Sequence, residues 1–264
     1  MNVPQNPLCQ NKSLRVEYSA VKKLNKTMKR EYHKWYSQSL GRDMELLAYG
    51  HGGTPVLVFP TSQGRFFEYE DRGMAETLRG KLDSGSMRLF CVDSVDSESW
   101  YNKSVHPRVR IARHQQYENY VLTEVVPRIQ QVNGAGGLVT HGCSFGAYHA
   151  MNFALRHPQL VTKCVTMGGA FEIKQFLDGY YDDDCYFHSP HDYMQSMADG
   201  EYLKSFRSNF YLLVTGEHDM CWDKNERFAQ VLRSKQIPHQ LYVWRDGTGH
   251  DWPWWQRMAQ AYLP

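Results

Sequence analysis

The stretch Gly142-Cys143-Ser144-Phe145-Gly146-Ala147 lies between a β-branched run and a run with helical periodicity. It has the pattern Gly-x-Ser-x-Gly of a nucleophile elbow, in which two glycines let the chain turn sharply from a strand into a helix. Such a turn exposes the hydroxyl of Ser144 and directs the N–H of Phe145 to the same point. A serine in this geometry predicts acyl transfer through a covalent intermediate. Because the pattern also arises by chance, the prediction depends on partners elsewhere in the chain.

A serine hydroxyl needs a base to act as a nucleophile, and the base needs a group that orients it. Asp219 follows an apolar run at 210–215, and His250 follows another at 239–244. Loops after parallel strands meet at one edge of a sheet, so we expect both side chains to reach Ser144. Asp223 competes with Asp219 as the acid, but its position better suits the cap of a helix that starts near residue 224.

Strand-like and helix-like segments alternate along the chain. This alternation predicts an α/β fold with a mainly parallel, twisted sheet and helices on both faces, in one domain over 30–264. Residues 171–208 have no clear period, and we expect an irregular insertion there. The expected strands are 30–37, 43–49, 55–60, 88–93, 137–141, 161–167, 210–215 and 239–244, and the expected helices are 74–82, 117–131, 145–156, 224–235 and 252–262.

Four motifs extend the argument from chemistry to a family. From about residue 30 onward the chain resembles the α/β-hydrolase superfamily, and within it the esterases that include formylglutathione hydrolases, enterobactin esterases and the antigen 85 acyltransferases. The resemblance implies the α/β-hydrolase fold, with Ser144, His250 and Asp219 as a catalytic triad. The motifs are Phe59-Pro60-Thr61-Ser62, His141 to Ala147, Gly216-Glu217-His218-Asp219 and Gly249-His250-Asp251-Trp252-Pro253-Trp254-Trp255.

The same resemblance implies an oxyanion hole made of two backbone N–H groups. One belongs to Phe145, and the other falls near Ser62, with Thr61 and Gln63 as neighbours. The family's usual glycine is absent from this loop. Such donors oppose the charge on the substrate oxygen, and losing one costs about 3–4 kcal/mol. Four aromatic residues on loops that should border the site could form an apolar substrate pocket or simply pack the loops, namely Phe66, Phe67, Trp100 and Tyr101.

Charge and composition exclude several functional classes. The net charge of the 264 residues is +2, which argues against a dedicated nucleic-acid surface. Residues 11–30 carry seven basic side chains and one acidic one, without the apolar stretch of a secretory signal. We expect residues 1–29 to form a flexible basic leader, with recruitment to an anionic surface as the alternative. No apolar run is long enough for a transmembrane helix.

Metal and cofactor sites are not expected. The six cysteines are scattered without Cys-x-x-Cys pairs, which argues against zinc or redox motifs and predicts free thiols in a cytoplasmic protein. Asp182-Asp183-Asp184 with His188 and His191 could bind a metal. However, consecutive aspartates do not readily face one ion, and the spacing is not that of an EF-hand. A solvated loop is therefore the expected structure there.

These observations predict a serine-dependent carboxylic-ester hydrolase that acts on a small-molecule ester without a cofactor. One alternative is an acyltransferase that uses the same triad with an alcohol or thiol acceptor. Another is a non-catalytic binding protein on a hydrolase scaffold. The sequence leaves the acyl group, the alcohol and the oligomeric state open.

Overall fold

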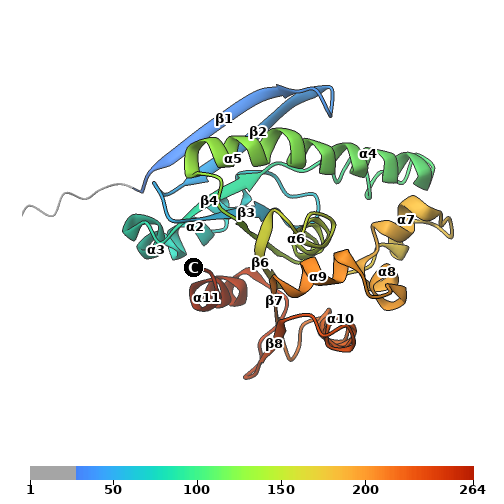
Figure 1. Cartoon of the computed structure of the whole chain (residues 1–264). Helices are drawn as coiled ribbons and strands as arrows, with labels where there is room; N and C mark the ends of the chain where they lie inside the picture. Colours follow the sequence, from blue (N-terminus) through green and yellow to red (C-terminus); the bar gives the residue numbers. More distant parts are fainter. Residues whose placement is uncertain (1–27) are drawn as a thin grey trace, which may run out of the picture.

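The computed structural model describes residues 28–264, which are built around one eight-stranded sheet with the strand order β1-β2-β4-β3-β5-β6-β7-β8 (Figure 1). All but the last two residues of the expected leader at 1–29 lie outside the described residues. The sheet begins with the hairpin of β1 and β2, pairs β2 antiparallel to β4, and is parallel from β4 to β8. The predicted α/β architecture with a mainly parallel sheet is therefore confirmed.

The strands begin and end close to the bounds expected from the apolar runs in the sequence. Strands β3, β4 and β5 are buried along almost their whole length, as expected for parallel strands covered on both faces. Strand β1 is an edge strand and is mostly exposed. The bounds are β1 Arg30–Ser37, β2 Arg42–Tyr49, β3 Thr54–Phe59, β4 Met87–Val92, β5 Leu138–Cys143, β6 Val161–Met167, β7 Phe210–Gly216 and β8 His239–Trp244.

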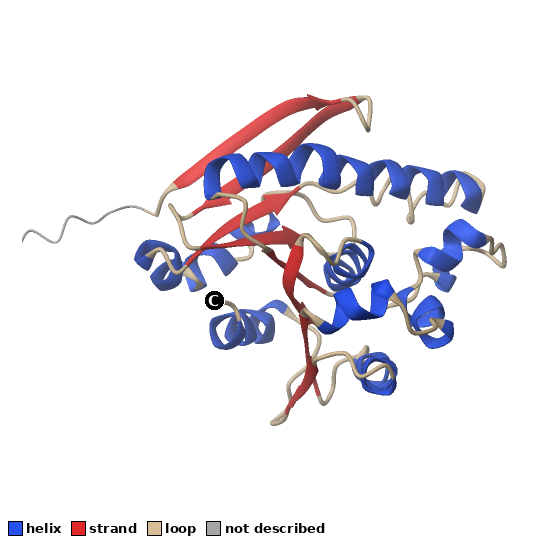
Figure 2. Ribbon diagram, in the orientation of Figure 1, coloured by secondary structure: helices blue, strands red, loops and turns tan. Residues whose placement is uncertain are grey.

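Helices lie on both sides of the sheet (Figure 2). The long ones are α4 Pro107–Tyr120, α5 Val126–Asn133, α6 Phe145–Arg156, α10 Trp222–Ser234 and α11 Trp252–Tyr262. The short ones are α1 Glu68–Asp71, α2 Met74–Thr77, α3 Arg79–Ser84, α7 Asp183–Phe187, α8 Pro190–Ser196 and α9 Glu201–Arg207, with a 3₁₀ turn at Lys174–Phe176.

Alternate residues of the strands divide the core into two layers. Leu57 and Phe59 of β3 join a cluster with α4, α5, α6 and α10, whereas Val56 and Val58 join a cluster with α2, α3 and α11. This period of two is the expected behaviour of a strand between two helical layers. The sheet is thereby held from both faces, and its carboxyl edge is left to the loops that carry the candidate site.

Three segments differ from the sequence prediction. The helix expected at 74–82 is divided at Leu78 into α2 and α3. The helix expected at 117–131 begins at Pro107 and continues through a π-helical stretch, Val121–Val125, to Asn133. The insertion at 171–208 contains the short helices α7, α8 and α9 rather than irregular chain alone. Helices of five to seven residues span too few turns to reveal a period in the sequence.

The described part of the chain holds five free cysteines, of which four are buried, namely Cys91, Cys143, Cys164 and Cys185. The fifth is Cys221. Over residues 28–264, no helix combines the length and apolarity needed to cross a bilayer.

Candidate active site

The elbow at Ser144 is a tight junction between β5 and α6. Ser144 has φ +55° and ψ −122°, a backbone conformation that L-residues rarely adopt. A Cβ at Gly142 would lie 2.2 Å from the carbonyl oxygen of Gly146, and one at Gly146 would lie 2.4 Å from the carbonyl oxygen of Phe59. Both glycines are therefore required by close backbone packing, and the turn lifts Ser144 to the carboxyl edge of the sheet.

Ser144, His250 and Asp219 form a hydrogen-bonded chain across three loops. The Ser144 hydroxyl lies 2.9 Å from Nε2 of His250, and Nδ1 of His250 lies 2.8 Å from Oδ1 of Asp219. Asp219 follows β7 and is buried, while His250 follows β8 and its side chain is 14% exposed. This arrangement suits proton transfer from Ser144, with the carboxylate fixing the imidazole tautomer.

The structure distinguishes the two candidate acids, because Asp219 contacts His250 and Asp223 does not lie in the triad. Asp223 lies in the first turn of α10, is exposed, and pairs with Arg227 at 3.0 Å. The predicted capping role of Asp223 is wrong, because α10 begins at Trp222 and its N-cap is Cys221. The N–H of this N-cap residue, Cys221, donates to Oδ1 of Asp219 at 2.7 Å.

The inner wall behind the triad is Gly168, which follows β6. Its φ is +59°, and a Cβ there would lie 2.6 Å from Oδ2 of Asp219 and 2.9 Å from Nδ1 of His250. The ring of Trp255 also packs edge-to-face on His250, with the ring centroids 4.9 Å apart. The imidazole is thus in contact with both a bare backbone and a buried indole.

Gly168→Ala is expected to lower kcat at least about 100-fold, because a displacement of the acid and base by about 1 Å is enough for such a loss. Gly134→Ala is the matched control. Gly134 also has a positive φ, +85°, but a Cβ there meets no atom within 4 Å. Steady-state ester kinetics on both variants provide the measurement. Equal losses of kcat would contradict the assigned role of Gly168.

The loop after β3 offers a free amide beside the elbow. Thr61 to Gly64 form a β-turn closed by the N–H of Gly64 on the carbonyl of Thr61, 2.8 Å. The N–H of Thr61 donates to Glu68, and that of Gln63 donates to Asp96. Within residues 28–264 the N–H of Ser62 has no acceptor. The N–H of Phe145 opens α6, where helical amides lack intrahelical partners.

The four aromatic residues proposed for the pocket have different environments. Trp100 is fully buried and packs on His114 and Tyr148, so it belongs to the core and cannot line an open pocket. The Tyr101 hydroxyl donates to Oγ of Ser62 at 2.7 Å, and its ring meets Phe145. Phe66 and Phe67 pack on each other, and Phe67 is the more exposed of the two.

The other polar residues of the motifs have structural partners. His141 is fully buried between the Tyr69 hydroxyl at 2.9 Å and the Val165 carbonyl at 2.8 Å. Cys143 is also fully buried, and burial raises the pKa of its thiol, which opposes a nucleophilic role. Asp251 caps α11 by accepting the N–H of Trp252.

The acidic stretch at 182–184 is not gathered around an ion. Asp182 caps α7 by accepting the N–H of Cys185, and Asp183 is exposed. His188 is the C-cap of α7 and is fully buried. The prediction of a solvated loop is therefore wrong for this segment, because residues 183–187 and 190–196 are helical and His188 between them is fully buried.

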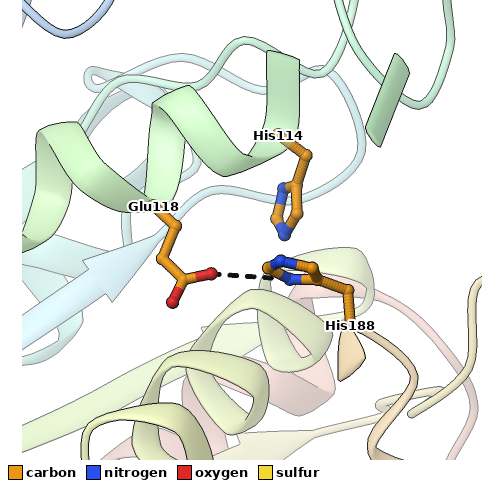
Figure 3. Close-up of side chains that lie close together, drawn as sticks. All are labelled: His114, Glu118 and His188. Atoms are coloured by element: carbon orange, nitrogen blue, oxygen red, sulfur yellow. Dashed lines mark ion pairs between the residues drawn. The ribbon is translucent and has the colours of Figure 1, made fainter. Parts of the chain in front are cut away.

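His188 faces His114 and Glu118, which lie one turn apart on α4 (Figure 3). One ligand atom from each lies within 4.8 Å of the others, a spacing open to a metal. However, the two oxygens of Glu118 already accept from Arg156 at 2.7 and 2.9 Å. One of them also accepts from His157 at 2.7 Å. These contacts describe an ion-pair network that needs no metal to balance the carboxylate.

Buried histidines make stability sensitive to acid. Burial lowers the pKa of His141 and of His188 to about 4. Between pH 6.5 and 4 the unfolded chain therefore binds more protons than the folded one, and the free energy of unfolding falls as pH falls. The expected slope is up to about 1.4 kcal/mol per pH unit for each histidine. Urea unfolding measured between pH 6.5 and 4 should show this slope of the free energy of unfolding against pH. The slope should be smaller in His141→Gln. An unchanged slope in that variant would contradict the contribution assigned to His141.

Comparison with known proteins adds the fold family. A family model described as alpha/beta hydrolase fold matches residues 96–218. The chain has the α/β-hydrolase fold. No curated protein matches the sequence significantly. Several solved structures match most of the chain. A ferulic acid esterase superposes with a TM-score of 0.72 at 20% identity, covering 90% of this chain and 97% of its own.

Two further structures are similar at 15% identity. An S-formylglutathione hydrolase from Agrobacterium tumefaciens has a TM-score of 0.71 and covers 89% of this chain and 93% of its own. A fluorophosphonate-binding serine hydrolase from Staphylococcus aureus has a TM-score of 0.68 and covers 89% of this chain and 96% of its own. At such identities the likeness establishes the α/β-hydrolase fold, and the chemistry must be argued from the site.

Proposed function

We propose that this α/β-hydrolase cleaves carboxylic esters of small molecules through an acyl-enzyme on Ser144. The observation that carries the proposal is the pair of hydrogen bonds from Ser144 to His250 and from His250 to Asp219, 2.9 and 2.8 Å. The solved structure of the same fold that is named as a ferulic acid esterase supports esters as the substrate class.

In the first half of the reaction, Oγ of Ser144 attacks the ester carbonyl while Nε2 of His250 takes its proton. The carbonyl oxygen becomes an oxyanion that accepts hydrogen bonds from the N–H groups of Phe145 and Ser62. Asp219 stabilises the imidazolium and keeps its orientation. The tetrahedral intermediate then collapses as His250 protonates the leaving alcohol, which leaves the acyl group on Ser144.

In the second half, water attacks the acyl-enzyme and His250 takes one of its protons. Collapse releases the carboxylic acid and returns the proton to Ser144. Each step uses only side chains and amides of this chain, so the proposal includes no cofactor. We also propose a cytoplasmic location, because the five cysteines within residues 28–264 are free thiols.

Covalent labelling tests the proposal directly. A fluorophosphonate probe should modify the protein once, and peptide mass spectrometry should find the adduct on Ser144. Ser144→Ala should remove the adduct without loss of the fold. A panel of p-nitrophenyl esters with increasing acyl length would then report the preferred acyl group.

Product analysis separates hydrolysis from acyl transfer. Turnover in the presence of an added alcohol or thiol should yield the free acid as the main product. An acylated acceptor as the main product would instead establish a transferase. A protein that neither reacts with the probe nor hydrolyses any ester would be a binding protein on the same scaffold.

A further inference from the structure

We propose that Asp96 is a positioning residue that fixes the oxyanion turn, Thr61 to Gly64, onto the nucleophile helix α6. The inference rests on the proposed esterase function, which it extends to a residue outside the triad. Asp96 is 1% exposed and lies in the loop after β4. Both of its oxygens accept hydrogen bonds from groups other than Ser144.

The two oxygens of Asp96 connect the two halves of the oxyanion site. Oδ2 accepts the N–H of Gln63 at 3.1 Å, and Oδ1 lies 2.9 Å from Nε2 of His149. His149 lies one helical turn after Phe145 on α6, and the two rings meet edge-to-face at 4.8 Å. A single buried carboxylate thus spans from the turn that carries Ser62 to the helix that begins with Phe145.

The turn needs this restraint because of the residue at its third position. Gln63 has φ +56°, a conformation that glycine adopts freely and that disfavours a residue with a Cβ. Ser62 has no positive φ, so the turn is of the type II class, which calls for glycine where this chain has glutamine. The hydrogen bond to Asp96 offsets the cost of holding Gln63 in this state.

A second carboxylate holds the start of the turn. Glu68 accepts the N–H and the hydroxyl of Thr61, at 2.8 and 2.5 Å. With Thr61 bound to Glu68 and Gln63 bound to Asp96, the amide left between them is that of Ser62. Asp96 and Glu68 therefore bind the amides on either side of Ser62 and leave the N–H of Ser62 for the oxyanion. Neither carboxylate contacts the triad.

The central experiment compares Asp96→Asn with wild type in ester hydrolysis. The amide can accept through only one of its two head atoms, so either the bond from Gln63 or the bond from His149 is lost and the turn is no longer tied to α6. We expect kcat to fall about 10-fold or more, within the loss of about 10²–10³ for a whole oxyanion donor, while KM stays within about twofold. Asp93→Asn, a change at another buried aspartate that pairs with Arg65, is the matched control and should retain kcat.

Two further variants separate positioning from general stability. Ser62→Pro removes the proposed donor at the turn position that proline prefers, and should lower kcat about 100-fold. Adding Asp96→Asn to Ser62→Pro should then cost little more, because the donor that Asp96 positions is already gone. Gln63→Gly should restore part of the kcat of Asp96→Asn, since glycine adopts the turn without the anchor.

The outcomes are distinct. Wild-type kcat in Asp96→Asn, or losses that multiply in the double variant, would overturn the positioning role while the esterase proposal stands. An inactive wild-type protein would overturn the esterase proposal itself. Should Asp96→Asn not fold, His149→Phe breaks the same link from the helix side and keeps an aromatic ring; a retained kcat there would equally refute the role of Asp96.

Discussion

Ser144→Ala is expected to lower kcat for p-nitrophenyl acetate about 10⁵- to 10⁶-fold. The variant removes the atom that becomes acylated, and the loss of a triad nucleophile in serine hydrolases has an effect of this size. The hydroxyl lies 2.9 Å from its base, so the serine is already placed for attack. A residual acceleration of about 10³-fold over water should remain, because the oxyanion amides still bind the developing charge.

The control for Ser144→Ala is the neighbouring residue. Cys143→Ala removes a potential nucleophile one residue away, but its thiol is fully buried and close to the Tyr69 hydroxyl. We expect this variant to retain most of its activity and the full fluorophosphonate label. If activity survives in Ser144→Ala and disappears in Cys143→Ala, then Cys143 and not Ser144 is the nucleophile, and the proposed mechanism is refuted.

The sheet and its ends could be predicted because burial on both faces leaves a clear mark in the sequence. The strand Val161–Met167 and the helix Phe145–Arg156, both mostly buried, have the bounds expected from the sequence. The edge strand His239–Trp244 also has the expected bounds, although it is only partly buried. Loops at the carboxyl ends of parallel strands converge by topology. For this reason the sequence also indicated which loops would carry the triad.

Helix α4 shows why other elements were mispredicted. Its buried face is largely polar, with Arg110, His114 and Glu118 facing inward, so the apolar period is lost. Arg110 is buried because it pairs with Asp178 and donates to the carbonyl of Phe176. The local signal that could have marked the start was the cap, since His106 precedes Pro107 at the first helical position.

The turn Thr61 to Gly64 shows that sequence-based prediction is limited in the same way at the candidate site. The sequence indicated Ser62 by resemblance, yet Asp96 and Glu68 carried no signal of their own. They act on backbone amides of Gln63 and Thr61, and such a bond requires no side-chain pattern at the donor. Only the fold brings Asp96 from the loop after β4 to the loop after β3.

Asp219→Asn is expected to lower kcat about 10⁴-fold. The side-chain amide carries no charge, and where its NH2 faces Nδ1 of His250 it favours the wrong imidazole tautomer. The buried carboxylate also stabilises the imidazolium that forms as Ser144 attacks, and an amide cannot do so. KM should change little, because Asp219 does not touch the substrate.

Asp223→Asn is the matched control four residues on. It alters an exposed ion pair with Arg227, which contributes about 0.3–0.5 kcal/mol to the helix and nothing to the triad. Its kcat should equal that of the wild type. The pair is measured in parallel by ester kinetics and by the rate of fluorophosphonate labelling, which reports the reactivity of Ser144 independently of deacylation. A loss confined to Asp223→Asn would show that the hydrogen bond from His250 to Asp219 is not the one that supports catalysis.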